Sequence, residues 1–115
     1  MTVLLVAIGG AMGALARFGI AQATSSIWAI LAINVAGSFA LGVLIASAHR
    51  ISGDVNDAVG IGFLGGFTTF STFSMHVVQE ADAGRAEVAF LYAAASVVLG
   101  VVAAGAGFYG TRALS

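Results

Sequence analysis

The polar residues that could do chemistry in this chain gather in residues 60–74. Four glycines there are followed by five hydroxyl residues interleaved with phenylalanine. Each glycine costs a helix about 1 kcal/mol relative to alanine, so Gly65-Gly66 followed by Thr68-Thr69 predicts a weak point. If a membrane helix opens there, freed carbonyls must be buried in protein or line a cavity, where they can ligate a small cation such as Na⁺. The alternative is an unbroken helix whose hydroxyls bond back to their own turn.

Phenylalanines form a second pattern in the same segment. Phe63, Phe67, Phe70 and Phe73 follow helical spacing, and Phe70 and Phe73 stand on one face. An aromatic ring has a positive edge and a negative face. Edges turned inward would therefore stabilise an anion, whereas faces turned inward would favour a cation. Simple packing against neighbouring helices or lipid is the alternative interpretation.

Three further polar residues stand among apolar neighbours elsewhere in the chain. Asn34 supplies two N–H donors and an oxygen acceptor, so it can join two helices or present its NH₂ group to an anion. Tyr92 and Ser96 are four residues apart, on one helical stripe, and both carry hydroxyl donors. They could line a path, although a tyrosine is also a common belt residue at the membrane interface.

The elements that must position these residues are membrane spans. The chain has 115 residues, of which 60% are hydrophobic and 8% are charged, whereas a soluble domain has about 25% charged residues. Crossing a bilayer takes about 20 mainly apolar residues. Four stretches qualify, at about 2–20, 27–48, 58–79 and 88–111. We therefore predict one all-α integral membrane domain over residues 1–115, with four transmembrane helices and a break in the third.

The first span has an alternative interpretation as a cleaved signal peptide. It lacks the positively charged region that precedes the apolar core of such peptides, and Arg17 stands just before the only candidate cleavage site. A membrane span is the better interpretation.

Short connections and balanced charge bear on topology. The connections force neighbouring helices to run antiparallel, and an even number of spans places both termini on one side. Arg50 and Arg112 fall on the side of the termini, and Arg17 and Arg85 fall on the other. Orientation follows such arginines, so a count of two against two is typical of dual topology with antiparallel dimers. A single orientation fixed by weaker cues or by a partner chain remains the alternative. Glycines such as Gly13 and Gly37 offer surfaces for close helix assembly.

Several function classes are excluded by what the spans lack. The chain has no cysteine and no lysine, so it has neither a thiolate site nor a basic patch for nucleic acid. No Asp, Glu or Lys lies within a span, whereas proton-coupled transporters usually keep an ionisable group there. His76 is the only titratable residue in the third span, and no nucleophile–base pair is present. Passive conduction therefore fits better than pumping, and we expect no enzyme activity.

Three motifs give the chain a resemblance to a known family. Residues 9–17 match GGxxGAxxR, residues 34–39 match NxxGSF, and residues 62–73 match GFxGGxTTFSTF. In these motifs, and over nearly its whole length, the chain resembles the small Fluc/CrcB fluoride channels. The resemblance implies antiparallel, dual-topology dimers with two pores in the inner (plasma) membrane, which export fluoride passively.

The resemblance also implies roles for individual residues. The backbone carbonyls of Gly65 and Thr68 would hold a structural Na⁺ that is not transported. The fluoride pore would be lined by Asn34, Phe70, Phe73, Tyr92 and Ser96. Arg17 matches the arginine at the end of the first helix, in a vestibule or structural role. Gly100 stands where the family often has one more hydroxyl on the fourth helix.

Two other functions remain as alternatives. A small multidrug-type exporter would have a similar length and four spans, but its mechanism needs a membrane carboxylate, which the first span lacks. A non-conducting partner subunit of a heterodimeric channel would share the same motifs. The sequence leaves homodimer and heterodimer open.

Overall fold

The computed structural model describes all residues 1–115, and its regular elements are all helical. The elements are α1 (Thr2–Thr24), α2 (Ile27–Ala46), the 3₁₀-helix η1 (Ala48–Arg50), α3 (Gly53–Asp57), the π-helix η2 (Ala58–Leu64), α4 (Gly65–Phe67), α5 (Phe70–Asp82) and α6 (Ala86–Leu114). Four helical stretches are long and apolar enough to cross a membrane, and the third, Gly53–Asp82, comprises α3 to α5. The predicted all-α class with four such helices is confirmed.

Capping residues place the helix ends a few residues away from the predicted limits of the spans. The first helix continues to Thr24 and the fourth to Leu114, whereas the second already ends at Ala46. At the first connection Ser25 adopts a left-handed conformation with φ 56°. Next to it, the Ser26 hydroxyl accepts the N–H of Trp28 at 3.2 Å and so begins α2. Apolar composition therefore locates the spans, and the caps decide where the helices stop.

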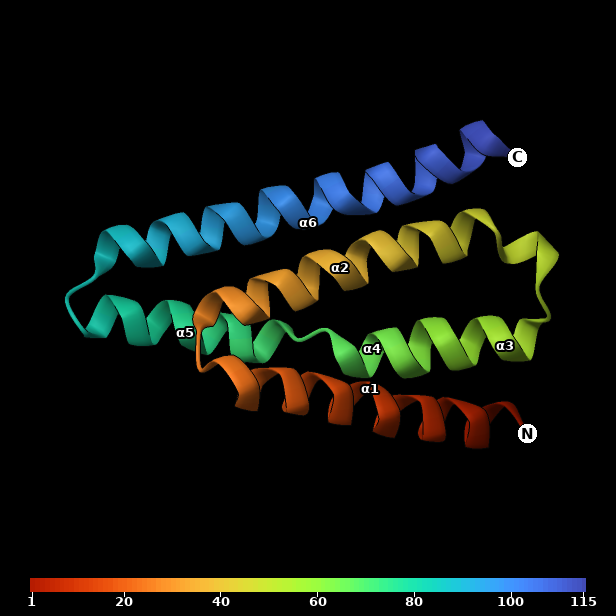
Figure 1. Cartoon of the computed structure of the whole chain (residues 1–115), viewed down its shortest axis with the longest axis horizontal. Helices are drawn as coiled ribbons and strands as arrows, with labels where there is room; N and C mark the ends of the chain where they lie inside the picture. The colour runs from red at the N-terminus through yellow and green to blue at the C-terminus, as the bar shows by residue number, and fades with distance from the viewer.

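The helices pack as antiparallel neighbours along a molecule 48 Å long (Figure 1). α1 lies against α3, η2 and α4, while α2 and α6 lie against each other along α2, and both also contact α5. Both termini lie at one end, together with the connection that contains η1, as the even number of spans predicts. The length compares with about 40–45 Å for a bilayer including its headgroups.

Two glycines show how closely these helices approach. A Cβ atom at Gly13 would overlap the carbonyl of Phe63, and one at Gly37 would overlap the Thr68 methyl group. These glycine surfaces, which the sequence suggested for assembly, are therefore occupied by contacts within the chain.

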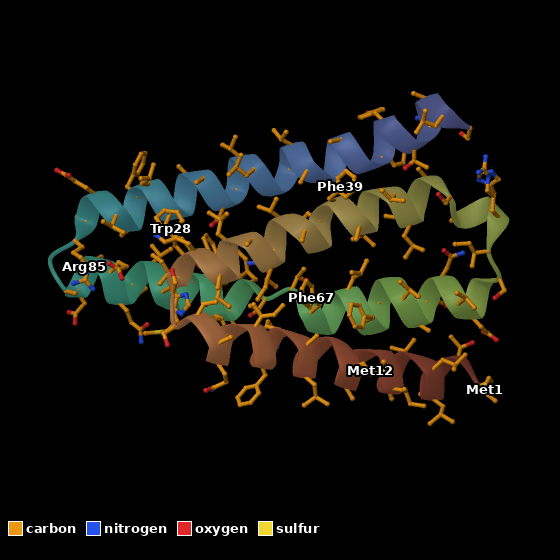
Figure 2. The ribbon with its side chains drawn as sticks, in the orientation of Figure 1. Met1, Met12, Trp28, Phe39, Phe67 and Arg85 are labelled. Atoms are coloured by element: carbon orange, nitrogen blue, oxygen red, sulfur yellow. The ribbon has the colours of Figure 1, made fainter.

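The chain buries few of its residues. Only 10 of 115 are buried, and Tyr92 is the one large side chain that is fully enclosed. Figure 2 shows side chains projecting outward from α1 and α6, and large apolar residues such as Met12, Phe90 and Val101 are exposed there. Such a surface must be covered by lipid or by another chain.

Candidate functional site

The third span leaves helical conformation at two residues. α4 ends at Phe67, which Figure 2 labels, and Thr68 and Thr69 have extended backbone with ψ of 157° and 122°. The Thr68 N–H still donates to the Leu64 carbonyl at 3.0 Å, and the Thr68 hydroxyl donates to the same oxygen at 2.9 Å. α5 begins afresh at Phe70, with the Thr69 hydroxyl accepting the N–H of Thr72 at 3.2 Å.

Several carbonyls lose their helical partners at this interruption, those of Gly65 and Thr68 among them. In an α-helix the carbonyl of residue i accepts the N–H of residue i+4. The N–H of Thr69, which would reach Gly65, donates instead to Asn34 Oδ1 at 2.8 Å. The N–H of Thr72, which would reach Thr68, donates to the Thr69 hydroxyl. The carbonyls of Gly65 and Thr68 are thus released from the helix, and they are hard oxygen ligands.

Asn34 joins α2 to the interruption through both ends of its amide. Its Oδ1 accepts the Thr69 N–H, and its Nδ2 donates to the Thr69 carbonyl at 3.0 Å. The amide therefore replaces two backbone partners that the helix no longer provides. Nδ2 carries two N–H groups, so one donor is left for another acceptor.

Arg17 supports the interruption from α1. Its Nε donates to the carbonyl of Gly66 at 3.2 Å, although the two residues are 49 positions apart. In a continuous helix that carbonyl would accept the N–H of Phe70, which lies beyond the extended residues. The guanidinium thus satisfies a third carbonyl and binds the first helix to the third.

A π-helical turn precedes the interruption, and the sequence reasoning did not anticipate it. η2 spans Ala58–Leu64, and the N–H that follows it, from Gly65, reaches back to the Gly60 carbonyl. Such turns insert one residue into a helix and occur often at functional sites. The glycines at positions 60 and 62 were the only feature of the sequence that could have indicated this π-helical turn, because they allow a widened turn to pack closely against a neighbouring helix. Gly62 lies against α1 so closely that a Cβ would approach Val6 to within 2.8 Å of its carbonyl.

A groove of about 490 Å³, the central groove, opens beside the interruption. It is lined from α2, the third span and α6, and no charged side chain lines it. The predicted site residues among its lining are Asn34, Gly65, Thr68, Phe70, Phe73 and Ser96. The structure therefore brings together every predicted pore and cation residue except Tyr92, in an uncharged setting.

The two phenylalanines of α5 differ in how they sit in the central groove. Phe70 is 79% exposed, whereas Phe73 is partly covered, and their ring centroids lie 5.7 Å apart at an interplanar angle of 52°. Phe63 and Phe67 instead stack on each other with an interplanar angle of 13°. Phe70 and Phe73 form one wall of the groove, while Phe63 and Phe67 do not line it.

Ser96 and Tyr92, on α6, occupy different environments. The Ser96 hydroxyl is buried at the central groove without a hydrogen-bond partner. Tyr92 is fully enclosed, so it is not an exposed interfacial belt residue. Its ring meets Trp28 edge to face at 5.6 Å and Phe73 at 5.4 Å, and its hydroxyl lies 3.4 Å from His76 Nδ1. Tyr92 thus stands behind the groove wall.

Comparison with known proteins gives consistent relatives along nearly the whole chain. A family model described as "CrcB-like protein, Camphor Resistance (CrcB)" matches residues 4–108. A protein of Rhizobium leguminosarum bv. trifolii named "Fluoride-specific ion channel FluC" is 41% identical, with 97% of each chain covered. A Francisella philomiragia protein of the same name is 38% identical over 95% of this chain and 93% of its own. Rhodococcus jostii "Fluoride-specific ion channel FluC 1" is 44% identical over 89% of this chain and 78% of its own.

Proposed function

The chain belongs to the CrcB-like family, and on this premise we propose that it is a fluoride-selective channel. It lies in the cell's inner (plasma) membrane as a multi-pass protein and lowers cytoplasmic fluoride by passive export. The names of its relatives give the ion. The observation that carries the proposal in this chain is the central groove, which places donors and aromatic rings together without a fixed charge.

The groove offers the chemistry that fluoride needs. A small anion holds its water strongly, so a path must replace that water with donors. The second N–H of Asn34 and the partnerless Ser96 hydroxyl are such donors. The ring edges of Phe70 and Phe73 add weak positive potential. A larger anion gains less from these few donors, which is the basis of selectivity.

The same proposal includes an antiparallel, dual-topology dimer with Na⁺ at its centre. One chain presents the released carbonyls of Gly65 and Thr68, and two copies would present four. No group of three acidic or histidine side chains offers another cation site. The Na⁺ is structural, and it would fix the crossing of the two interruptions. Phe70 is 79% exposed in the single chain, so its ring is available to be covered by a second copy.

Flux from liposomes tests the function. Liposomes that contain the purified protein in Na⁺ buffer should release fluoride but not chloride. Ion-selective electrodes follow the release. Phe70→Ile or Phe73→Ile should lower the flux sharply while the dimer persists, because ring edges are lost and volume is nearly kept. Phe90→Ile is the control, since Phe90 is 77% exposed and lies outside the groove.

Other outcomes would decide against the proposal. Unchanged flux in both groove variants would remove their pore role. Proton-driven efflux of a cationic dye would favour an exporter. Flux that appears only with a second homologous chain would make this chain a partner subunit. Replacing Na⁺ by a large organic cation should lower both fluoride flux and the dimer fraction measured by cross-linking, and an unchanged dimer fraction would exclude the structural Na⁺.

A further inference from the structure

Ser38, on α2, is a polar residue of the central groove to which the proposed path gives no role. It lines the groove and is half-buried. It follows Asn34 by four residues, so the two side chains lie on one face of α2, about 6 Å apart along the helix axis. α2 therefore presents a hydroxyl to the groove one turn beyond the amide.

A glycine on α6 leaves the space in front of this hydroxyl open. Gly100 lines the groove beside Ser38, and the only atom of another helix within 4 Å of a Cβ at Gly100 would be Ser38 Oγ, at 3.8 Å. This is an ordinary contact distance, so a side chain would fit at position 100 and would cover the hydroxyl. Glycine leaves the hydroxyl facing the groove.

α2 and α6 contribute their groove residues in two levels. Both helices run in the same direction (Figure 1), and Ser38 lies next to Gly100. One turn earlier on each helix stand Asn34 and Ser96, which form the first level and supply the donors already described. At the second level, formed by Ser38 and Gly100, only Ser38 has a side chain that can donate.

The other hydroxyls that line the groove are engaged in holding the interruption. The Thr68 hydroxyl donates to the Leu64 carbonyl, and the Thr69 hydroxyl caps α5. The Ser38 hydroxyl makes no side-chain hydrogen bond of this kind within the chain, so its donor is free. Beyond the second level, α2 and α6 line the groove with apolar side chains, those of Leu41, Val101 and Ala104.

We propose that Ser38 is a further donor of the fluoride path, which receives the anion from the first level, and that Gly100 keeps its hydroxyl accessible. The inference rests on the proposed channel function. A strongly hydrated anion needs a donor at each step to replace its water. Without the Ser38 hydroxyl, fluoride that leaves Asn34 and Ser96 would enter the apolar part of the groove with no donor from these helices.

Helix packing at this level does not depend on the Ser38 hydroxyl. The close approach of α2 to the third span is made by Gly37, where a Cβ would overlap the Thr68 methyl group. Ser38→Ala keeps nearly the same volume, and alanine is the better helix former. This variant should therefore be as stable as the wild type, which separates a donor role from a structural one.

Fluoride flux from liposomes, expressed per folded protein, tests the inference. Ser38→Ala should lower the flux roughly tenfold, the size of one hydrogen bond to a charged group. Ser74→Ala is the matched control, because Ser74 is a half-buried serine of the third span that lies outside the central groove. Its flux should equal that of the wild type.

A second substitution at Gly100 provides a rescue experiment. Ser38→Ala combined with Gly100→Ser returns a hydroxyl to the second level from the opposite helix, and most of the lost flux should recover. Ser38→Ala combined with Gly100→Ala returns only a methyl group at the same place, and its flux should stay low. The two double variants differ by one oxygen atom, so their comparison holds even if Ser38→Ala lowers the folded fraction.

Wild-type flux in Ser38→Ala would overturn the inference. Equal flux in the two double variants would also overturn it, because the hydroxyl would then have no effect at this level. Absence of fluoride flux in the wild-type protein would instead defeat the channel proposal itself.

Discussion

The α2–α6 pair and the interruption of the third span hold the same chain together by different means. α2 and α6 are continuous, and they approach where a Cβ at Gly42 or Gly107 would overlap the carbonyl of Ala104 or Phe39. The interruption is held by hydrogen bonds, chiefly from Asn34 and Arg17. Close packing alone can hold two helices together where every backbone group is hydrogen-bonded within its own helix. Backbone that has left the helix needs side chains as hydrogen-bond partners. The second arrangement leaves carbonyls available, and that is why binding is expected there.

The largest effect should come from breaking the contact between α2 and α6. Gly107→Ala places a Cβ against the Phe39 carbonyl, and backbone on both sides cannot yield without separating the helices. We expect a loss of roughly 3 kcal/mol in the free energy of unfolding, measured by reversible denaturation in detergent.

Gly105→Ala is the matched control on the same helix. Nothing lies within 4 Å of a Cβ at this position, and alanine is the better helix former by about 1 kcal/mol. This variant should be as stable as the wild type or slightly more so. Equal stability of the two variants would show that close approach does not hold the pair.

A smaller effect on stability, but a direct one on conduction, should follow Asn34→Ala. The Thr69 N–H and carbonyl both lose their partner, at about 1 kcal/mol net for each hydrogen bond, so we expect a loss of about 2 kcal/mol in stability. We expect fluoride flux per folded protein to fall roughly tenfold or more, which corresponds to about 1.4 kcal/mol or more in the conducting step.

Asn56→Ala separates stability from conduction. Asn56 Nδ2 also bonds two carbonyls, those of Ala48 at 3.0 Å and Ile51 at 3.3 Å, but it lies outside the central groove. Asn56→Ala should lower stability without changing the flux per folded protein. If both variants reduce flux alike, Asn34 acts through general stability and not through the path.

The sequence predicted the parts of the fold that depend on composition and spacing. Four apolar stretches appear as four helices able to span a membrane, and the termini lie at one end. The residues chosen from the polar third span and from Asn34 and Ser96 line one groove. Their roles in binding remain predictions.

Other features depend on contacts that no sequence pattern displays. The π-helical turn coincides with the close packing of Gly62 against α1. The partner of Arg17 is a carbonyl 49 residues away, and any residue type can supply a carbonyl. The placement of Tyr92 behind the groove depends on how α6 is rotated about its own axis. It also depends on the contact with Trp28, which belongs to none of the three sequence motifs. Helix rotation and backbone acceptors are decided by the whole packing, so they could not be predicted.

The smallest effect is expected for Arg17→Gln. This variant distinguishes residues that support the interruption from residues that line the fluoride path. Arg17→Gln keeps a donor but shortens its reach to the Gly66 carbonyl, so we expect a loss of about 1 kcal/mol in stability. Arg17 does not line the central groove, so Arg17→Gln should change the flux per folded protein less than Asn34→Ala does. Arg85→Gln, at an exposed ion pair with Glu80, should alter neither quantity, because such pairs contribute little. A fall in flux as large as that of Asn34→Ala would place Arg17 in the path, because a supporting contact outside the groove cannot reach the anion.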